Sequence, residues 1–201
     1  LQVYKNRHIL LNIPKGTVPT MLKVVTWRGR TEQLPAFYKM LRTGVHSTNA
    51  KLGGMPLWFE VEQTFISEPK EKAAYIIEDI PLPLPNRWKR NIRPAAITKL
   101  AKGIFATVTF DGDVWLIYGL MDDNRKLTWK RYAAGLHEPL SIEVVDGKIH
   151  VFTRNGIIRL HDFNNDKEAD FYENFCNLFG QTAETREFAS SFAKHPEGGF
   201  I

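Results

Sequence analysis

The feature that most constrains the fold is an internal repeat in the second half of the chain. Gly103 and Gly147 lie 44 residues apart, as do Gly112 and Gly156, and each marks a turn beside a segment of alternating apolar residues. A repeat of roughly 40 to 50 residues that contains such strands is typical of the four-stranded blades of a β-propeller. We therefore predict consecutive four-stranded antiparallel sheets from residue 88 onward.

The repeat predicts two complete sheets and the start of a third. A third sheet is expected to open at Arg186–Ala189, with residues 196–201 as its first turn and the beginning of its second strand. Because a propeller closes with roughly four to eight blades, the remaining blades are expected from residues outside this sequence or from another protein chain. The eight complete strands are predicted at 96–100, 104–110, 114–118, 128–133, 140–145, 148–153, 156–161 and 169–175.

The first half has a different pattern. Leu34, Phe37, Tyr38 and Leu41 recur at helical spacing and predict one short helix at 31–42. The proline run at 81–87 cannot form a regular central strand, because proline lacks the backbone donor, so we predict a linker and a domain boundary there. The fold class is mainly β: an incomplete propeller at 88–201, preceded by a small β-rich domain at 1–80. Short strands are expected in that domain at 8–13, 21–27, 59–65 and 74–78.

Composition excludes several classes of function. The formal charge of +5 comes from 27 basic and 22 acidic residues that are interspersed, whereas nucleic-acid binding needs a concentrated basic face. No segment approaches the roughly 20 apolar residues of a membrane-spanning helix. The single cysteine, Cys176, excludes an internal disulfide and a Cys-x-x-Cys-His haem site within these residues. The motifs of nucleotide-binding loops and serine hydrolases are missing from the sequence as well.

A twelve-residue acidic segment has the spacing of a calcium-binding loop. Oxygen-bearing side chains at positions 1, 3, 5, 9 and 12, with a backbone carbonyl at position 7, can surround one Ca²⁺. Position 6, which favours glycine, is Lys167, and its charge opposes a cation. The alternative is a polar loop whose side chains bond its own backbone. The predicted ligands are Asp162, Asn164, Asp166, Glu168, Asp170 and Glu173.

Two connections between sheets hold polar side chains that could form a ligand funnel. His137 and Glu138 precede the second sheet, and Arg186 and Glu187 occupy the corresponding entry to the third. Connections of this kind often carry the ligand sites of propellers. The alternative is that the four side chains cap strands and pair with one another.

Several motifs resemble the large secreted β-propeller proteins of planctomycetes and verrucomicrobia that are labelled membrane-bound dehydrogenases, whose propeller is similar to that of sorbosone and glucose dehydrogenases. The resemblance covers about Trp88 to Ile201. It implies an exported protein, periplasmic or extracellular, whose propeller is followed by a c-type cytochrome domain, so that haem c belongs to parts of the parent protein outside this sequence. The motifs are Trp88–Arg90, Phe110–Leu120, Trp129–Leu140, Arg159–Asp162, Glu168–Phe175 and Glu184–Ala189.

Two functions follow as hypotheses. We expect these residues to form a binding or scaffold module within a redox-linked protein, with a c-type cytochrome or a polysaccharide as partner. The alternative, implied by the resemblance, is a quinoprotein-like sugar or alcohol dehydrogenase that passes electrons to a cytochrome. The sequence assigns no catalytic residue, so whether the protein is an enzyme stays open.

Overall fold

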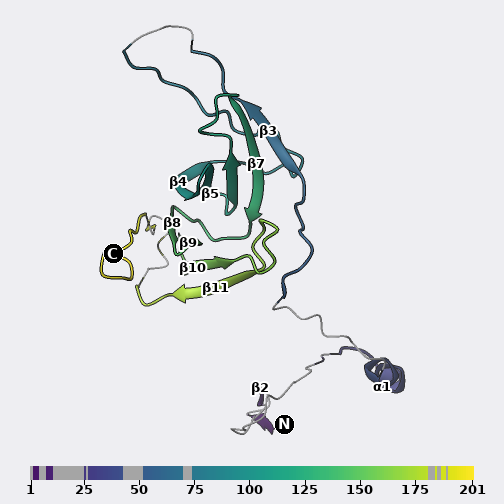
Figure 1. Ribbon diagram of the computed structural model, residues 1–201. Helices are drawn as coiled ribbons and strands as arrows, with labels where there is room; N and C mark the ends of the chain where they lie inside the picture. The colour runs from purple at the N-terminus through teal and green to yellow at the C-terminus, as the bar shows by residue number, and fades with distance from the viewer. Residues whose placement is uncertain are drawn as a thin grey trace. The chain divides into compact units, whose positions relative to one another are not determined.

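The computed structural model divides the chain into two compact units, Leu1–Thr48 and Asn49–Ile201, which are described separately (Figure 1). It describes residues 2–4, 8–10, 25, 27–42, 52–69, 74–180, 184, 187–188 and 190–201. Within these ranges, no helix has the length and apolarity needed to cross a membrane.

The first unit contains a short hairpin and the predicted helix. Strands β1 (Gln2–Tyr4) and β2 (His8–Leu10) pair antiparallel. The 3₁₀ turn η1 (Thr31–Gln33) leads into α1 (Leu34–Arg42), so the prediction of a helix at 31–42 is confirmed. The predicted strand at 21–27 falls largely outside the described residues; Val25 and Trp27, which are described, are not in a strand.

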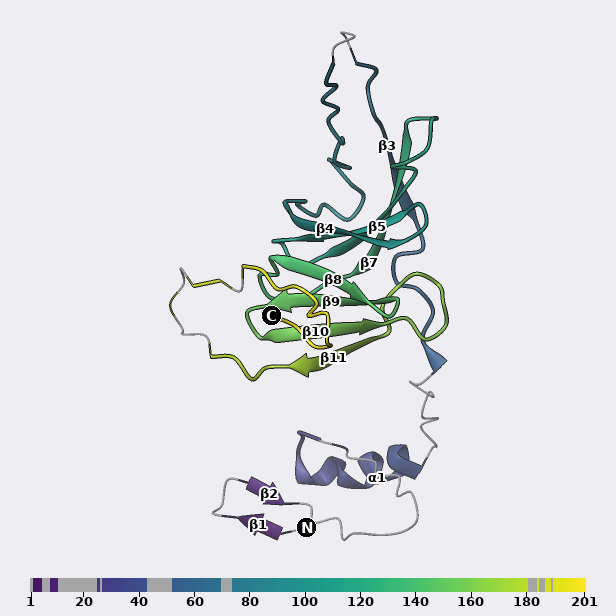
Figure 2. The same cartoon turned by 60° about the vertical axis from the view of Figure 1, so that its left-hand side comes forward.

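The second unit consists of two antiparallel sheets whose strands follow one another along the chain. The five-stranded sheet has the order β3-β7-β6-β5-β4 and the four-stranded sheet the order β11-β10-β9-β8. Figure 2 shows them as separate layers, with β8 next to the first sheet. The eight strands predicted from residue 96 onward correspond to β4 through β11, and their positions are confirmed to within a few residues. The strands are β3 (Val61–Phe65), β4 (Pro94–Ala101), β5 (Ile104–Thr109), β6 (Val114–Tyr118), β7 (Lys126–Ala133), β8 (Ser141–Val145), β9 (Lys148–Thr153), β10 (Gly156–His161) and β11 (Phe171–Cys176).

The sequence repeat is also a structural repeat. Gly103 and Gly147 occupy the first turn of each sheet with φ values of 71° and 72°, a left-handed conformation that glycine adopts without strain. The third and fourth strands of both sheets share a register shift, at Val114/Trp115 in one sheet and at Ile157/Ile158 in the other. The two bulges differ by one residue from the 44-residue offset, so the two sheets are similar but not identical at this point.

The main core lies between the two sheets. Side chains from one face of β5, β6 and β7 pack against side chains from β8, β9 and β10, and the innermost strands β4 and β8 lie against each other. The burial of these apolar side chains is the principal source of stability for a pair of stacked sheets. The buried residues are Ala106, Val108, Val114, Leu116, Tyr132, Ala133, Leu136, Ile142, Ile149, Val151 and Leu160.

The proline run covers the opposite face of the five-stranded sheet. Leu82, Trp88 and Ile92 pack on a second apolar cluster that contains Trp115 and Trp129. The predicted boundary at 81–87 is therefore corrected: the apolar residues around the prolines bind this segment to the sheet, and β3, which precedes it, pairs with β7. The structure instead divides the chain between residues 48 and 49.

A buried ion network fixes the end of this covering segment. Asp113 is fully buried, and its carboxylate accepts hydrogen bonds from Arg90 Nε at 2.8 Å and from Arg131 Nη2 at 2.9 Å. Arg131 is also buried, and its guanidinium lies 4.3 Å from the centre of the Trp58 ring. Two arginines facing one carboxylate compensate for the desolvation of the charge.

Two other predicted strands differ from the structure. Ala74–Glu78 is not in a strand, since no described strand lies alongside to complete its backbone hydrogen bonds. Of the predicted strand at 186–189, only Glu187 and Phe188 are described, and neither is in a strand. The turn expected after them is present, because Ala193 and Ile201 exchange two backbone hydrogen bonds of 2.8 and 3.0 Å around it.

Candidate functional site

The acidic loop between β10 and β11 folds largely on its own backbone. Asp162 accepts a hydrogen bond from the Lys167 backbone N–H at 3.1 Å, and Asp166 accepts one from the Glu168 N–H at 2.9 Å. Lys167 itself has a φ of 69°, so a lysine adopts the conformation for which a calcium loop uses glycine. These hydrogen bonds agree with the alternative prediction for this segment, a polar loop whose side chains bond its own backbone.

Two of the predicted calcium ligands hold a distant segment of the chain instead. The two carboxylate oxygens of Glu168 accept the backbone N–H groups of Leu57 and Trp58 at 2.8 and 2.9 Å. Asp170 accepts the N–H of Gly54 at 2.8 Å. We refer to residues 54–58 as the strap. Sequence reasoning missed this contact, because nothing in the sequence links a Gly-Gly turn to a loop more than a hundred residues away.

Gly53 adjoins the strap in a left-handed conformation that favours glycine. Its φ is 78°, and a Cβ at this position would lie 2.9 Å from the side chains of Asn164 and Asp170. A larger residue would therefore strain the backbone and shift the Asn164 and Asp170 side chains that bond Gly54.

Glu173, the last predicted calcium ligand, lies in β11 and bonds elsewhere. It accepts hydrogen bonds of 2.7 Å from Arg159 Nε and Nη2 and is 2.6 Å from His161 Nε2. These contacts, with Arg159 first, lower the pKa of Glu173 to about 2. In the described part of the chain, no three His, Cys, Asp or Glu side chains group to hold a metal ion. Calcium binding stays a prediction.

The structure places only part of the predicted funnel, and its side chains pair with residues outside the predicted set. His137 Nδ1 is 3.1 Å from Asn155 Oδ1, and Glu138 forms a 3.0 Å ion pair with Arg154. Arg154 also donates to the backbone carbonyl of Glu184 at 2.6 Å, which ties the connection before β8 to the segment after β11. Glu187 is exposed, and Arg186 lies outside the described residues.

One cavity lies between the two sheets, at the opposite end of the strands from the predicted funnel. Its volume is about 510 Å³. The walls come from the β4–β5 and β8–β9 turns and the β10–β11 loop, so regular elements of both sheets position them. Its polar lining residues are Tyr132, Asp146, Lys148, His161, Asp162, Asn165 and Lys167, and its apolar ones include Leu100, Ile104 and Leu160.

Asp162 and Tyr132 give this cavity its chemistry. Asp162 Oδ1 is buried and has no hydrogen-bond partner, although a buried acceptor without a donor costs about 1–3 kcal/mol. Burial, and next the charge of Asp162, raises the pKa of Tyr132, so the phenol stays protonated at neutral pH and can donate. Asp162 and Tyr132 both line the cavity, so its wall holds a carboxylate and a protonated phenol.

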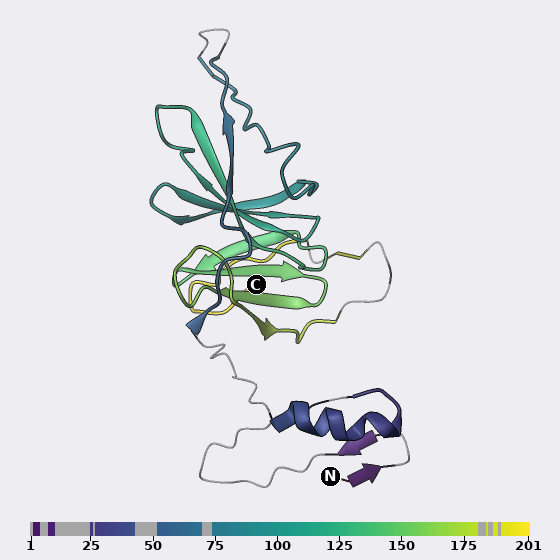
Figure 3. The ribbon, with the colours of Figure 1, turned by 90° about the vertical axis from the view of Figure 1, so that its right-hand side faces the viewer.

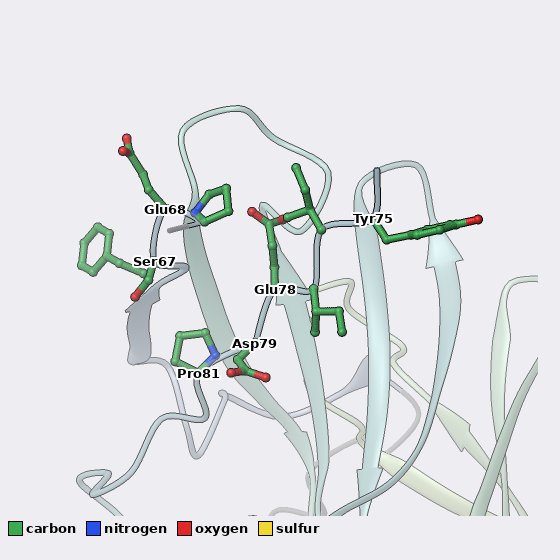
Figure 4. A pocket seen from close by; sticks show the side chains of 10 residues that line it. Ser67, Glu68, Tyr75, Glu78, Asp79 and Pro81 are labelled. Carbon is green, nitrogen blue, oxygen red and sulfur yellow. The ribbon is translucent and has the colours of Figure 1, made fainter. Parts of the chain in front are cut away.

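A further cavity of about 520 Å³ lies between two arms of an irregular loop, residues 65–69 and 75–81 (Figure 4). Glu68, Glu78 and Asp79 are among its lining residues. Because both walls are irregular segments apart from Phe65 at the end of β3, its side chains are less rigidly placed than those between the sheets. We therefore take the cavity between the sheets as the candidate site.

Comparisons of the chain with protein-family models, with curated proteins and with solved structures found no match.

Proposed function

We propose that residues 88–201 are a run of β-propeller blades that serves as a ligand-binding and scaffold module of an exported, redox-linked protein, with the cavity between the two sheets as the ligand site. Export and the redox link rest on the resemblance described above. The blade assignment is supported by two sheets with the same order of four consecutive strands, the same geometry at the first turn and a bulge near the start of the third strand.

The direction in which the sheets stack also supports the blade assignment. Ala106 and Val108 of the first sheet face the second sheet. Their counterparts 44 residues later, His150 and Phe152, instead contact Phe200 and Phe192 of the C-terminal segment, with ring centres 5.2 and 5.5 Å apart. Each sheet thus offers one kind of face to the unit before it and another to the unit after it. Head-to-tail contacts of this kind generate rings or open arrays.

The observation that carries the ligand-binding proposal is the presence of the Asp162 carboxylate and the Tyr132 phenol in the wall of one cavity. A ligand with several hydroxyl groups can donate to the carboxylate and accept from the phenol. Phe163 and His161, whose ring centres lie 5.6 Å apart at the same cavity, add apolar surface of the kind that packs against sugar rings. We therefore propose a neutral carbohydrate as the ligand class.

Calorimetric titration with a panel of neutral oligosaccharides tests this proposal. We expect Asp162→Asn and Tyr132→Phe each to weaken binding by roughly tenfold or more, the loss of a hydrogen bond of about 1.5 kcal/mol. Asp162→Asn keeps an oxygen for the Lys167 N–H but places an amide donor at the unsatisfied position. Asp122→Asn, on an exposed turn, is the matched control.

Binding that neither cavity variant weakens, or no binding to any sugar of the panel, would overturn the ligand assignment. Reduction of an artificial electron acceptor by the sugar-loaded intact protein would instead favour the dehydrogenase alternative.

A further inference from the structure

The outer edge of the first sheet is closed by an added strand. Strand β3 pairs antiparallel with β7 along its whole length, from Val61 opposite Lys130 to Phe65 opposite Lys126. The repeat unit itself ends at β7, so β3 is a fifth strand that arrives from an earlier part of the chain. This sheet shows that the outer edge of the unit can accept a strand.

The second sheet offers the equivalent edge without such a strand. Strand β11 corresponds to β7, since each is the fourth strand of its repeat and pairs with the third. Among the residues that the structure describes, β11 pairs only with β10. Phe171 and Phe175 on β11 are exposed. An open edge of six residues with exposed aromatic side chains is a template for another strand.

The chain also holds a segment with strand character that pairs with nothing described. Ala74–Glu78 combines a tyrosine with two isoleucines, residue types favoured in strands. Tyr75 and Ile77 are 90% and 91% exposed, and Figure 4 shows the Tyr75 ring extending away from the other labelled side chains. Arg125 holds the base of this segment through Glu78 and the Ser67 carbonyl, which keeps it projecting from the end of β3.

We propose that Ala74–Glu78 of one molecule adds as a fifth strand to the outer edge of β11 in a second copy of this chain. Figures 1, 2 and 3 agree that the segment and β11 lie at opposite ends of the second unit, so the two do not meet within one molecule. The contact joins two different surfaces, and repetition links molecules head to tail. This association is independent of the cavity between the sheets.

Sedimentation velocity over a hundredfold range of protein concentration tests the proposal. The wild-type mass is expected to rise above 23.1 kDa with concentration. The donor variant, Ile76→Pro with Ile77→Pro, removes two adjacent backbone donors from an exposed segment and is expected to remain monomeric. The acceptor variant, Asn174→Glu, places a carboxylate on β11 opposite the strand that carries Glu78 and is expected to remain monomeric as well.

A mixing experiment makes the test specific to these two surfaces. The donor variant keeps an intact β11 and the acceptor variant keeps an intact 74–78 segment, so an equimolar mixture is expected to form a dimer and nothing larger. Asn177→Glu, one residue beyond the end of β11, is the matched control and should associate like the wild type. A wild type that stays monomeric, variants that associate unchanged, a control that fails to associate, or a mixture without dimers would each overturn the proposal.

Discussion

The buried ion network predicts a large difference between two neighbouring aspartates. Asp113 and Asp111 are two residues apart, and each accepts charged hydrogen bonds of 2.8 Å from an arginine. Asp113 is fully buried, whereas Arg93, the partner of Asp111, has 57% of its side chain exposed. The two aspartates therefore form the same kind of ion pair, one buried and the other exposed to solvent.

We expect Asp113→Asn to lower the free energy of unfolding by about 3–5 kcal/mol. The amide leaves the buried Arg131 guanidinium without its counter-charge, and removing one partner of a buried pair costs this much because the other charge stays desolvated. For a domain of this size, the loss corresponds to a fall in Tm of roughly 6–20 °C. Asp111→Asn is expected to cost about 0–1 kcal/mol, the usual range for an exposed pair.

Urea unfolding followed by tryptophan fluorescence measures both variants, because Trp115 and Trp129 are buried in the same sheet. If Asp113→Asn unfolds within about 1 kcal/mol of the wild type, or if Asp111→Asn loses as much as Asp113→Asn, the burial argument is wrong.

Two further predictions concern the acidic residues around β11. Glu168→Gln leaves one oxygen for two backbone donors, so hydrogen exchange at the Trp58 amide should accelerate roughly tenfold or more. The control, Glu143→Gln on β8, should leave that exchange rate unchanged. Equal protection of the Trp58 amide in both variants would show that the strap is held by other contacts. Because the pKa of Glu173 is lowered to about 2 from the usual 4.5, its contribution to stability is complete above about pH 5 and is lost as the pH falls toward 2. Denaturant titrations should show this loss in the wild type and a flatter acid limb in Glu173→Gln, and an identical pH dependence in both proteins would refute the assignment.

The local strand pattern of this protein could be predicted from sequence because it depends on short-range signals. Turn glycines such as Gly103 and Gly147, followed by alternating apolar residues, specify hairpins without reference to the rest of the chain. The helix at 31–42 was predictable for the same reason, from its spacing. The proline run was misassigned as a boundary because its apolar residues, among them Leu82 and Trp88, bind a sheet face that only the folded structure presents.

The candidate site was less predictable because it depends on long-range geometry. The acidic spacing of the β10–β11 loop is compatible with a metal, yet Glu168 and Asp170 face backbone N–H groups of a segment far away in sequence. The cavity depends on Tyr132 from the first sheet approaching Asp162 from the second. Nothing in the sequence links Tyr132 to Asp162, and only the stacking of the two sheets places them at one cavity.

The way in which the strap is held has a consequence for how this protein can change over evolutionary time. A carboxylate that accepts hydrogen bonds from backbone N–H groups does not depend on the side chains of the residues that donate them. The side chains of Met55 and Leu57 are moreover 91% and 75% exposed. The amino acids at those two positions should therefore vary among homologous chains, except that proline is excluded at Leu57 because its N–H is needed. Gly53, Glu168 and Asp170 should be conserved. Alignments of this region would then show a variable peptide between fixed anchors, a pattern easily mistaken for an unconstrained loop.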